Sequence, residues 1–196
     1  KEPRCMICGK PVKTEEQEYC RDCGKRAYAF DQGRSLWLHV PPVTQAIYQL
    51  KFHNKRYYAD IFAEEMAHWY GDWIRARGIE EIIPVPLHKS RLRARGFNQA
   101  ALLAERLSEE LQIPMGRHAV YRIRRTRPQK LLDDREREKN LKQAFGVSKQ
   151  WKAPRNVLLV DDIYTTGSTI HRISKVLKKA GVQKVYFLTI SIGQGL

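Results

Sequence analysis

The chain has 196 residues, which allows one ordinary domain and a small appendage. Its 36 Lys and Arg residues against 21 acidic residues give a formal net charge of +15, which favours polyanionic partners over other basic surfaces. Because no apolar run reaches the length of a membrane span and no leader-like segment is visible, we expect a soluble, cytoplasmic protein.

All four cysteines lie within the first 23 residues, as two Cys-x-x-Cys pairs separated by eleven residues. This spacing is typical of two turns that jointly hold one tetrahedral zinc ion, and four thiolates leave no open position for water. Two disulfides are the alternative, which the lack of an export signal disfavours. A glycine follows each pair, at 9 and 24, where we expect positive φ. The sequence therefore predicts a structural zinc site with the ligands Cys5, Cys8, Cys20 and Cys23.

Residues 25–42 are interpreted as a connector. After it we predict a short helix over 43–51 and a longer one over 56–77, because apolar residues recur there at helical spacing. The aromatic residues of the longer helix are more typical of a buried face than of a base-stacking surface. His53 and His68 are interpreted as surface or hydrogen-bonded histidines, not as metal ligands.

Residues 82–86 are expected to form the first strand of the sheet, with prolines at its exit. The next residues carry four cations in seven positions, namely Lys89, Arg91, Arg93 and Arg95. Such a segment cannot fold onto a core, so we expect a basic loop that leads to a helix starting near Phe97. A loop at the carboxyl end of a parallel strand is well placed to meet an anionic ligand, and a merely solvated loop is the alternative.

Residues 121–140 are dense in charge and contain few apolar anchors. This composition fits either a solvated helix with ion pairs between successive turns or a flap that closes over a ligand. We favour a flap at the start of the segment and a helix at its end. The candidate cations for a flap or a nucleic-acid contact are Arg122, Arg124, Arg125, Arg127 and Arg137.

Residues 157–169 combine an aliphatic run, two adjacent carboxylates and a loop of small hydroxyl residues around Gly167, followed by a helix-like pattern. Free backbone N–H groups at a helix N-terminus, helped by hydroxyls, favour a phosphate. Carboxylates accept hydrogen bonds from ribose hydroxyls or hold Mg²⁺. Neither a P-loop nor a dinucleotide fingerprint is present. A capped turn without a ligand is the alternative. A further buried strand is expected over 185–190.

Residues 157–169 resemble the phosphoribosyl pyrophosphate (PRPP) motif of type I phosphoribosyltransferases, which consists of an aliphatic run, two acids and Thr-Thr-Gly-x-Thr. Pro-Val-Pro, the basic segment and Arg95-Gly96-Phe97-Asn98-Gln99 are similar to the signature of the ComF family of competence proteins. A second stretch of that family, with Arg122, Arg124, Thr126, Gln129, Leu132, Arg137, Asn140 and Ala144-Phe145, lies in the same order. With the four-cysteine finger, the resemblance extends from Cys5 to the last strand.

The resemblance implies an α/β, type I phosphoribosyltransferase-like fold, in which helices flank a parallel-cored sheet. It implies a zinc finger and connector over 1–40 and a phosphoribosyltransferase-like domain over 41–196. Asp161 and Asp162 would meet ribose or Mg²⁺. The 5′-phosphate would lie against Thr165, Thr166, Gly167, Ser168 and Thr169, and pyrophosphate against a loop with Leu87, His88, Lys89 and Arg91.

The resemblance further implies a competence factor that helps to internalise single-stranded DNA and carries a PRPP-binding pocket. Its partners would include a DNA-uptake helicase and a recombinase-loading protein, and it would be recruited to the inner face of the membrane. The alternative is a salvage-type phosphoribosyltransferase acting on a free nucleobase or another small acceptor. Thr165 stands where purine-salvage relatives carry an aspartate base, so whether the chain catalyses transfer stays open.

Overall fold

The computed structural model describes residues 3–123 and 144–194. Its centre is a four-stranded sheet in the order β1-β6-β5-β2, in which every neighbouring pair is parallel. The two central strands are runs of aliphatic and aromatic residues buried on both faces, as expected where helices cover both sides of a parallel sheet. The strands are β1 (Gln32–Leu38), β2 (Glu81–Pro84), β5 (Asn156–Tyr164) and β6 (Lys184–Ile192).

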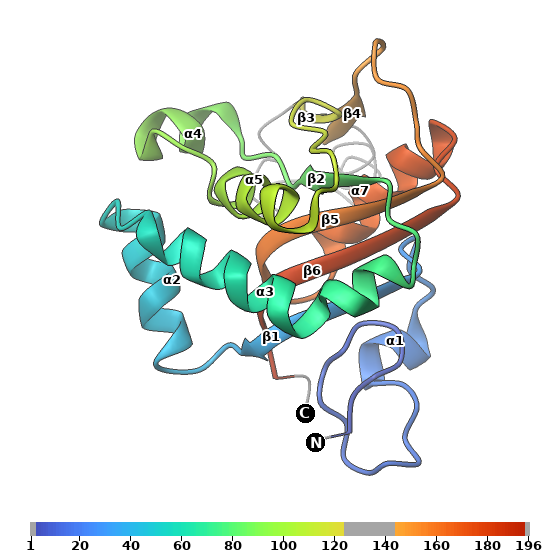
Figure 1. Ribbon diagram of the computed structural model, residues 1–196. Helices are drawn as coiled ribbons and strands as arrows, with labels where there is room; N and C mark the ends of the chain where they lie inside the picture. The colour runs from blue at the N-terminus through green and yellow to red at the C-terminus, as the bar shows by residue number, and fades with distance from the viewer. Residues whose placement is uncertain (1–2, 124–143, 195–196) are drawn as a thin grey trace, which may run out of the picture.

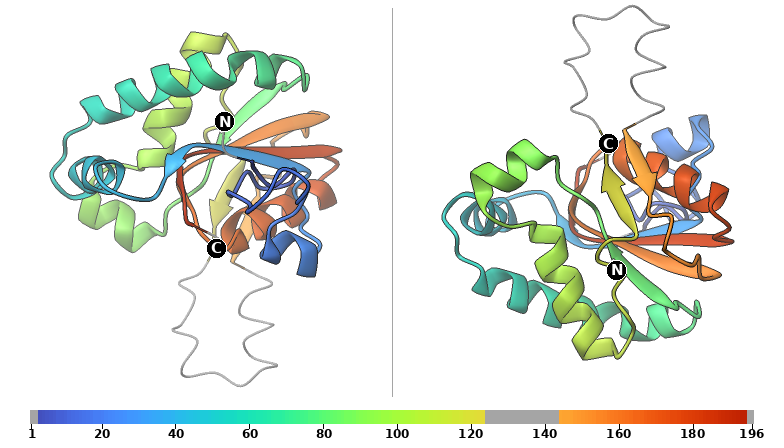
Figure 2. Two further views of the ribbon diagram at one scale, coloured as in Figure 1. Left: turned by 90° about the horizontal axis from the view of Figure 1, so that it is seen from below. Right: turned by 90° about the horizontal axis from the view of Figure 1, so that it is seen from above.

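Helices cover both faces of this sheet (Figures 1 and 2). On one face α3 and α5 pack over Leu158 and Leu188, and on the other α7 and the N-terminal cysteine segment pack over Leu159 and Phe187. The predicted α/β fold class with a parallel core is therefore confirmed. The helices are α1 (Arg21–Lys25), α2 (Val43–Phe52), α3 (Tyr57–Arg75), α4 (Lys89–Arg95), α5 (Gln99–Leu111) and α7 (Ser168–Lys179).

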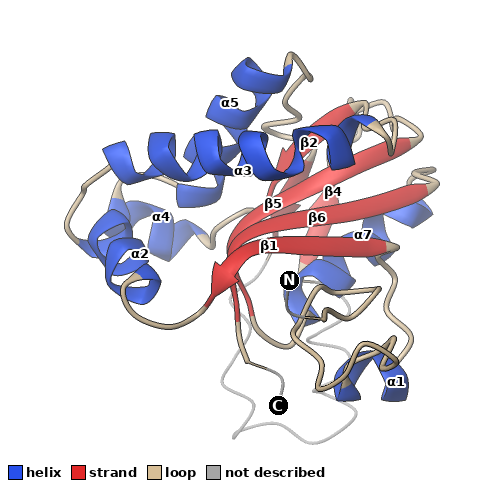
Figure 3. Ribbon diagram, turned by 60° about the horizontal axis from the view of Figure 1, so that its bottom comes forward, coloured by secondary structure: helices blue, strands red, loops and turns tan. Residues whose placement is uncertain are grey.

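The helices at the carboxyl edge of the sheet are α2 and α4, which lie beyond the ends of the strands (Figures 1 and 3). The helix predicted over 43–51 is α2, and that predicted over 56–77 is α3. The buried face of α3 was predicted only in part. Phe62, Met66 and Ile74 are buried, but Ile61 and Trp69 are exposed.

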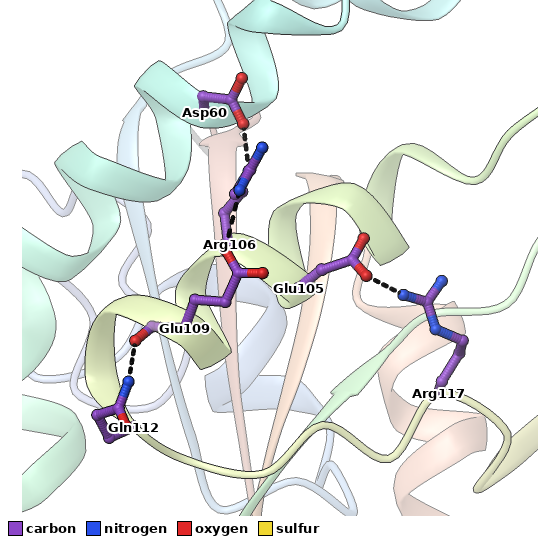
Figure 4. Close-up of polar contacts among 6 residues, drawn as sticks. All are labelled: Asp60, Glu105, Arg106, Glu109, Gln112 and Arg117. Atoms are coloured by element: carbon purple, nitrogen blue, oxygen red, sulfur yellow. Dashed lines mark hydrogen bonds and ion pairs between the residues drawn. The ribbon is translucent and has the colours of Figure 1, made fainter.

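An ion-pair network joins α3 to α5 on the outside of the molecule (Figure 4). Arg106 donates hydrogen bonds to Asp60 of α3 at 2.6 Å and to Glu109 at 2.9 Å. Arg117 pairs with Glu105 one turn earlier on α5. These exposed pairs contribute little stability, but they neutralise both arginines, so this surface is balanced in charge.

A short antiparallel ribbon flanks the segment in which a flap was expected. It consists of β3 (Val120–Arg122) and β4 (Phe145–Val147), with Arg122 opposite Phe145. The remaining cations of that expectation, Arg124, Arg125, Arg127 and Arg137, lie outside the described residues, so the flap and the helix stay predictions.

The interpretation of 25–42 as a connector was wrong in part, because this segment contains β1. The strand forms one edge of the sheet and pairs with β6 from Gln32 to Leu38. An edge strand needs no continuous apolar run, and this one mixes polar and apolar residues, so its sequence gave a weak signal. The domain division at residue 40 stays a prediction, and the pairing of β1 favours a boundary before Gln32.

The basic segment after β2 was expected to be a loop, but Lys89–Arg95 is the helix α4. Lys, Arg, Leu and Ala all favour helix, and neither Gly nor Pro interrupts the run. The His88 side chain caps it by accepting a hydrogen bond from the Ser90 N–H, and Gly96 ends it in a left-handed conformation. Four cations are therefore held on a short helix at the carboxyl edge. Among the described residues, no helix is long and apolar enough to cross a membrane.

Candidate functional site

The loop between β5 and α7 lies on an aromatic floor. The Tyr164 ring stacks on Phe187 with centroids 4.6 Å apart and planes 2° apart, and Phe30 meets both rings edge-on. Gly167 lies directly above Tyr164 with a φ of 72°. A Cβ atom at this position would lie 2.4 Å from the Tyr164 hydroxyl, so both the space and the backbone conformation require glycine there.

The hydroxyl residues of this loop face outward. Thr165, Thr166 and Thr169 are exposed, while Gly167 is buried. The Thr166 and Ser168 hydroxyls share a hydrogen bond of 2.9 Å, which presents them together at the first turn of α7. A helix N-terminus of this kind, flanked by hydroxyls, fits a phosphate group.

Asp161 and Asp162 lie within β5, not after its end as expected from the sequence. Pairing with β2 stops at Val160, but pairing with β6 continues to Tyr164. The carboxylates therefore lie where β5 extends beyond β2. Asp162 is 6 % exposed, and its carboxylate forms an ion pair with Lys51 of α2.

The two carboxyl groups have opposite protonation preferences. Burial raises the pKa of Asp161, and the adjacent negative charge of Asp162 raises it further. For Asp162, burial also opposes ionisation, but the Lys51 ammonium and a hydrogen bond from Asp161 hold its pKa below the ordinary value. Asp162 therefore keeps its negative charge more readily than Asp161, and a divalent cation or a ribose hydroxyl would change the protonation of Asp161.

The charges of Arg91, Arg172 and Asp161 all act on Arg122. Burial lowers the pKa of Arg122 in β3, and the positive charges of Arg91 in α4 and Arg172 in α7 lower it further, while Asp161 opposes them. The Nε atom of Arg122 is buried without a hydrogen-bond partner among the residues that the structure describes. Arg122 is thus repelled by two cations and has a buried donor without a described partner, so an anion beside it would stabilise its charge.

The residues expected to hold pyrophosphate lie at the junction of β2 and α4. Leu87 and His88 are half-buried, and Lys89 and Arg91 are exposed on the first turn of α4. The structure brings Arg91 toward Arg122 and Asp161. Of the DNA candidates, Arg93 is exposed and Arg95 is half-buried, hydrogen-bonded to Gln99.

The four cysteines form a buried cluster whose Sγ atoms all lie within 4.8 Å of one another, and all four thiols are free. A tetrahedral zinc ion with Zn–S bonds of about 2.3 Å requires sulfur separations of about 3.8 Å. Cys8 and Cys20 are 3.6 Å apart, so the donor set and its size fit a structural metal. A zinc ion with four thiolate ligands has a net charge of −2, which the nearby Lys10 would partly offset. Lys10 is 5 % exposed and also pairs with Asp22 at 2.7 Å.

Each cysteine turn contains the same kind of backbone hydrogen bond, but the two turns differ in backbone conformation. Gly9 donates to Cys5 and Gly24 to Cys20, each at 2.9 Å. Gly9 has the expected positive φ of 78°. The same expectation for Gly24 was wrong, because Gly24 lies inside α1 and is helical.

Sequence reasoning missed three residues of this site. Lys51 was assigned only to a short helix, Arg172 only to a helix, and Tyr28 only to the connector. Each reaches the site through tertiary packing: Lys51 pairs with Asp162, Arg172 lies near Arg122, and Tyr28 hydrogen-bonds the carbonyl of Thr166 at 3.0 Å. No local pattern around them indicates these contacts.

No family model matches the chain, but several proteins are similar along most of its length. Competence protein F of Haemophilus influenzae is 37% identical over 188 residues, which cover 93% of this chain and 82% of that protein. DNA utilization protein YhgH of Escherichia coli K12 is 32% identical over 184 residues, covering 92% of this chain and 80% of its own. Competence protein ComFC of Bacillus subtilis is 27% identical over 184 residues, covering 90% and 72%.

Solved structures with a related arrangement are more distant. A hypoxanthine phosphoribosyltransferase from Staphylococcus aureus matches with a TM-score of 0.42 and 14% identity, over 67% of this chain and 61% of that one. An adenine phosphoribosyltransferase from Thermoanaerobacter pseudethanolicus matches with a TM-score of 0.39 and 16% identity, over 74% and 81% of the two chains.

Proposed function

The chain belongs to the ComF/YhgH family of competence and DNA utilization proteins, and from this premise we propose that it helps to internalise single-stranded DNA during natural transformation. We propose further that its carboxyl-edge site binds PRPP. The observation that carries this proposal is that β5 carries an acid pair and leads directly into an exposed hydroxyl loop at the N-terminus of α7.

In this proposal each part of PRPP meets groups of matching chemistry. The 5′-phosphate lies against the loop 165–169 and the N-terminus of α7. The ribose hydroxyls and Mg²⁺ meet Asp161 and Asp162. Pyrophosphate meets the junction at Leu87 and His88 together with Lys89 and Arg91. The repulsion around Arg122 supports an anion on this side, because a bound pyrophosphate would relieve it.

The metal ions have different tasks in this proposal. Zn²⁺ bound by the four cysteines is structural, because four thiolates complete its coordination and the segment that they cross-link is too small for a core of its own. Mg²⁺ arrives with PRPP and neutralises its phosphates. The protein's own side chains then orient the sugar, and Lys51 stays paired with Asp162.

For the DNA role, the supporting observations are the family and the net charge of +15, which far exceeds what one PRPP molecule needs. The protein would act in the cytoplasm and be recruited to the inner face of the membrane, where a DNA-uptake helicase delivers the strand. A recombinase-loading protein would then receive it.

The test is fluorescence anisotropy with labelled single-stranded DNA at several salt concentrations, with and without Mg²⁺–PRPP. We expect binding that weakens steeply with salt and that changes when PRPP is added. No DNA binding at low salt would contradict the DNA role and favour a salvage-type transferase for a small acceptor. Calorimetry with Mg²⁺–PRPP tests the pocket separately. Asp161→Asn should lower the affinity at least about tenfold, and the exposed control Asp72→Asn should not.

A further inference from the structure

A group of aromatic side chains is exposed at the end of α2 and the start of α3. Tyr48 is 53% exposed, Phe52 62% and Tyr57 52%. Tyr48 and Phe52 lie one turn apart on α2 with ring centroids separated by 4.9 Å. Large aromatic residues gathered on a surface generally mark a binding site, because each leaves apolar area in water that a partner could cover.

Cations are interleaved with these rings. The Arg95 guanidinium of α4 lies 5.2 Å from the centroid of Phe52, and that of Arg56 lies 4.7 Å from the centroid of the buried Phe97. A pocket between α2 and α4 is lined by Lys51, Phe52, Arg91 and Arg95 among others. Phe52 of α2 and the arginines Arg91 and Arg95 of α4 therefore surround one pocket, with Tyr48 next to Phe52.

The two segments that build this surface contain no acidic residue. Neither Asp nor Glu occurs from residue 32 to 59 or from 82 to 104. Among the described residues, no ion pair joins Arg91 or Arg93 to a carboxylate. On the neighbouring α3–α5 surface, by contrast, Arg106 and Arg117 are both neutralised by acidic partners (Figure 4). Within the described part of the chain, positive charge on Arg91 and Arg93 is thus not offset by a carboxylate near the exposed aromatic rings.

We propose that this surface, the α2–α4 face formed by Tyr48, Phe52, Arg91 and Arg95, binds a strand of single-stranded nucleic acid. Bases stack on the rings and phosphates contact the arginines of α4, a combination that suits any base sequence. A membrane-binding helix would instead present a continuous apolar face, whereas on α4 only Leu92 is an exposed large hydrophobic residue. The inference rests on the proposed DNA role and names the surface that performs it.

The geometry of the rings limits how bases are held. A base inserted between two rings needs them about 7 Å apart, twice the stacking repeat of about 3.4 Å. Tyr48 and Phe52 are closer than this and are tilted by 43°. Bases therefore lie on the outward sides of the rings. Phe52 already packs against Arg95, so little side-chain conformational entropy is lost when a base binds.

The α2–α4 face also leads to the sugar-phosphate site. Lys51, which lines the pocket between α2 and α4, is the residue that pairs with Asp162. A nucleic-acid strand on this face would thus end beside the acid pair. Binding of PRPP to the acid pair would change the position or charge environment of Lys51 and thereby affect the face. This juxtaposition accounts physically for the coupling between PRPP and DNA binding in the proposed function.

The experiment measures the affinity of the full chain for a labelled oligothymidylate across a salt series. Tyr48→Ala and Phe52→Ala should each weaken binding about 5- to 100-fold, the usual loss for a base-stacking ring, with no change in salt slope. Arg91→Gln should weaken binding and reduce the magnitude of the slope by about 0.7. Matched controls are Trp69→Ala, an exposed aromatic beside Glu65 on α3, and Lys13→Gln, an exposed cation of the finger. Both should bind as the parent does.

Leucine at positions 48 and 52 provides a second test, because Tyr48→Leu and Phe52→Leu keep the apolar bulk but lose the stacking surface, and should still weaken binding. An oligonucleotide carrying 5-iododeoxyuridine should cross-link under ultraviolet light to the peptide that contains Tyr48 and Phe52. If the parent fails to bind DNA, the proposed function itself fails. If the parent binds DNA but the Tyr48 and Phe52 variants bind DNA equally well, the face is wrongly assigned and the DNA role stands. The same conclusion follows if, in a parallel measurement with anionic lipid vesicles, these variants lose affinity for the vesicles only.

Discussion

The hydroxyl of Tyr28 donates a hydrogen bond of 3.0 Å to the backbone carbonyl of Thr166, across 138 positions of the chain. Tyr28 follows the last cysteine of the cluster by five residues, and Thr166 lies in the phosphate loop. The next residue repeats the connection, because the Ala29 N–H donates to Nδ1 of His171 on α7 at 2.9 Å. The exit of the cysteine finger therefore fixes both the loop and the first turn of the helix that follows it.

We predict that Tyr28→Phe weakens PRPP binding although Tyr28 lies outside the proposed PRPP contacts. The variant keeps the ring, which stacks on Phe30, and loses only the hydroxyl that orients Thr166. A neutral hydrogen bond contributes about 1 kcal/mol, so calorimetry should show an affinity about fivefold lower. Zinc content, measured by a colorimetric chelator, should not change.

Tyr19→Phe is the matched control, because Tyr19 is an exposed tyrosine of the same finger. Its PRPP affinity should equal that of the parent. Equal affinity of Tyr28→Phe and the parent would show that the hydrogen bond to Thr166 does not position the loop.

A second prediction concerns the metal. Replacing Cys20 and Cys23 by Ser should release zinc, because two of the four ligands are lost. The N-terminal segment should then become sensitive to proteases. PRPP affinity should fall at least as far as in Tyr28→Phe, because the finger no longer holds Tyr28. A parent protein that contains less than about one zinc ion per chain by elemental analysis would contradict the assignment.

The parts of the site that could be predicted from the sequence are local. The cysteine spacing and the run from the aliphatic strand to Thr169 each occupy one short segment, so their spacing alone marks the four-cysteine cluster and the turn between β5 and α7. The same holds for the central strands β5 and β6, because continuous apolar runs have few alternatives to a buried parallel strand.

The parts that sequence could not predict depend on contacts between distant segments. The Lys51–Asp162 pair joins residues 111 positions apart, and no pattern near Lys51 indicates a partner. The strand β1 is stabilised by its pairing with β6 more than by its own composition. Local charge density suggested a loop at 89–95, but helix propensity and the His88 cap prevailed.

The Lys51–Asp162 pair leads to a third prediction, on stability. Both side chains are largely buried, so Asp162→Asn leaves an uncompensated ammonium group and should lower the free energy of unfolding by up to about 3 kcal/mol. Lys51→Met in the same protein removes that charge and should restore much of the loss. Urea denaturation of the parent, both single variants and the double variant gives the coupling energy. Strictly additive losses would show that the two charges do not interact.

The fourth prediction concerns pH and the start of β1. Asp31 pairs with Lys178 of α7 at 2.8 Å and with Lys184 of β6 at 3.0 Å, and accepts a hydrogen bond from the Val185 N–H at 3.0 Å. Burial by itself would raise its pKa, but these three groups together hold it below the ordinary 3.8. In its ionised form, the Asp31 carboxylate thus connects the start of β1 to α7 and to β6.

Because the pKa of Asp31 is lowered in the folded state, its contribution to stability is complete above the unfolded value of 3.8 and disappears as pH falls through the lower folded value. Asp31→Asn should therefore lower the free energy of unfolding by about 1–2 kcal/mol at neutral pH. The difference should shrink toward zero in the most acidic buffer in which both proteins remain folded. Asp72→Asn, at a fully exposed pair with Arg75, should change stability little at either pH. A difference between the parent and Asp31→Asn that stays constant down to that acidic limit would mean that the ion pairs of Asp31 do not hold β1 in the sheet.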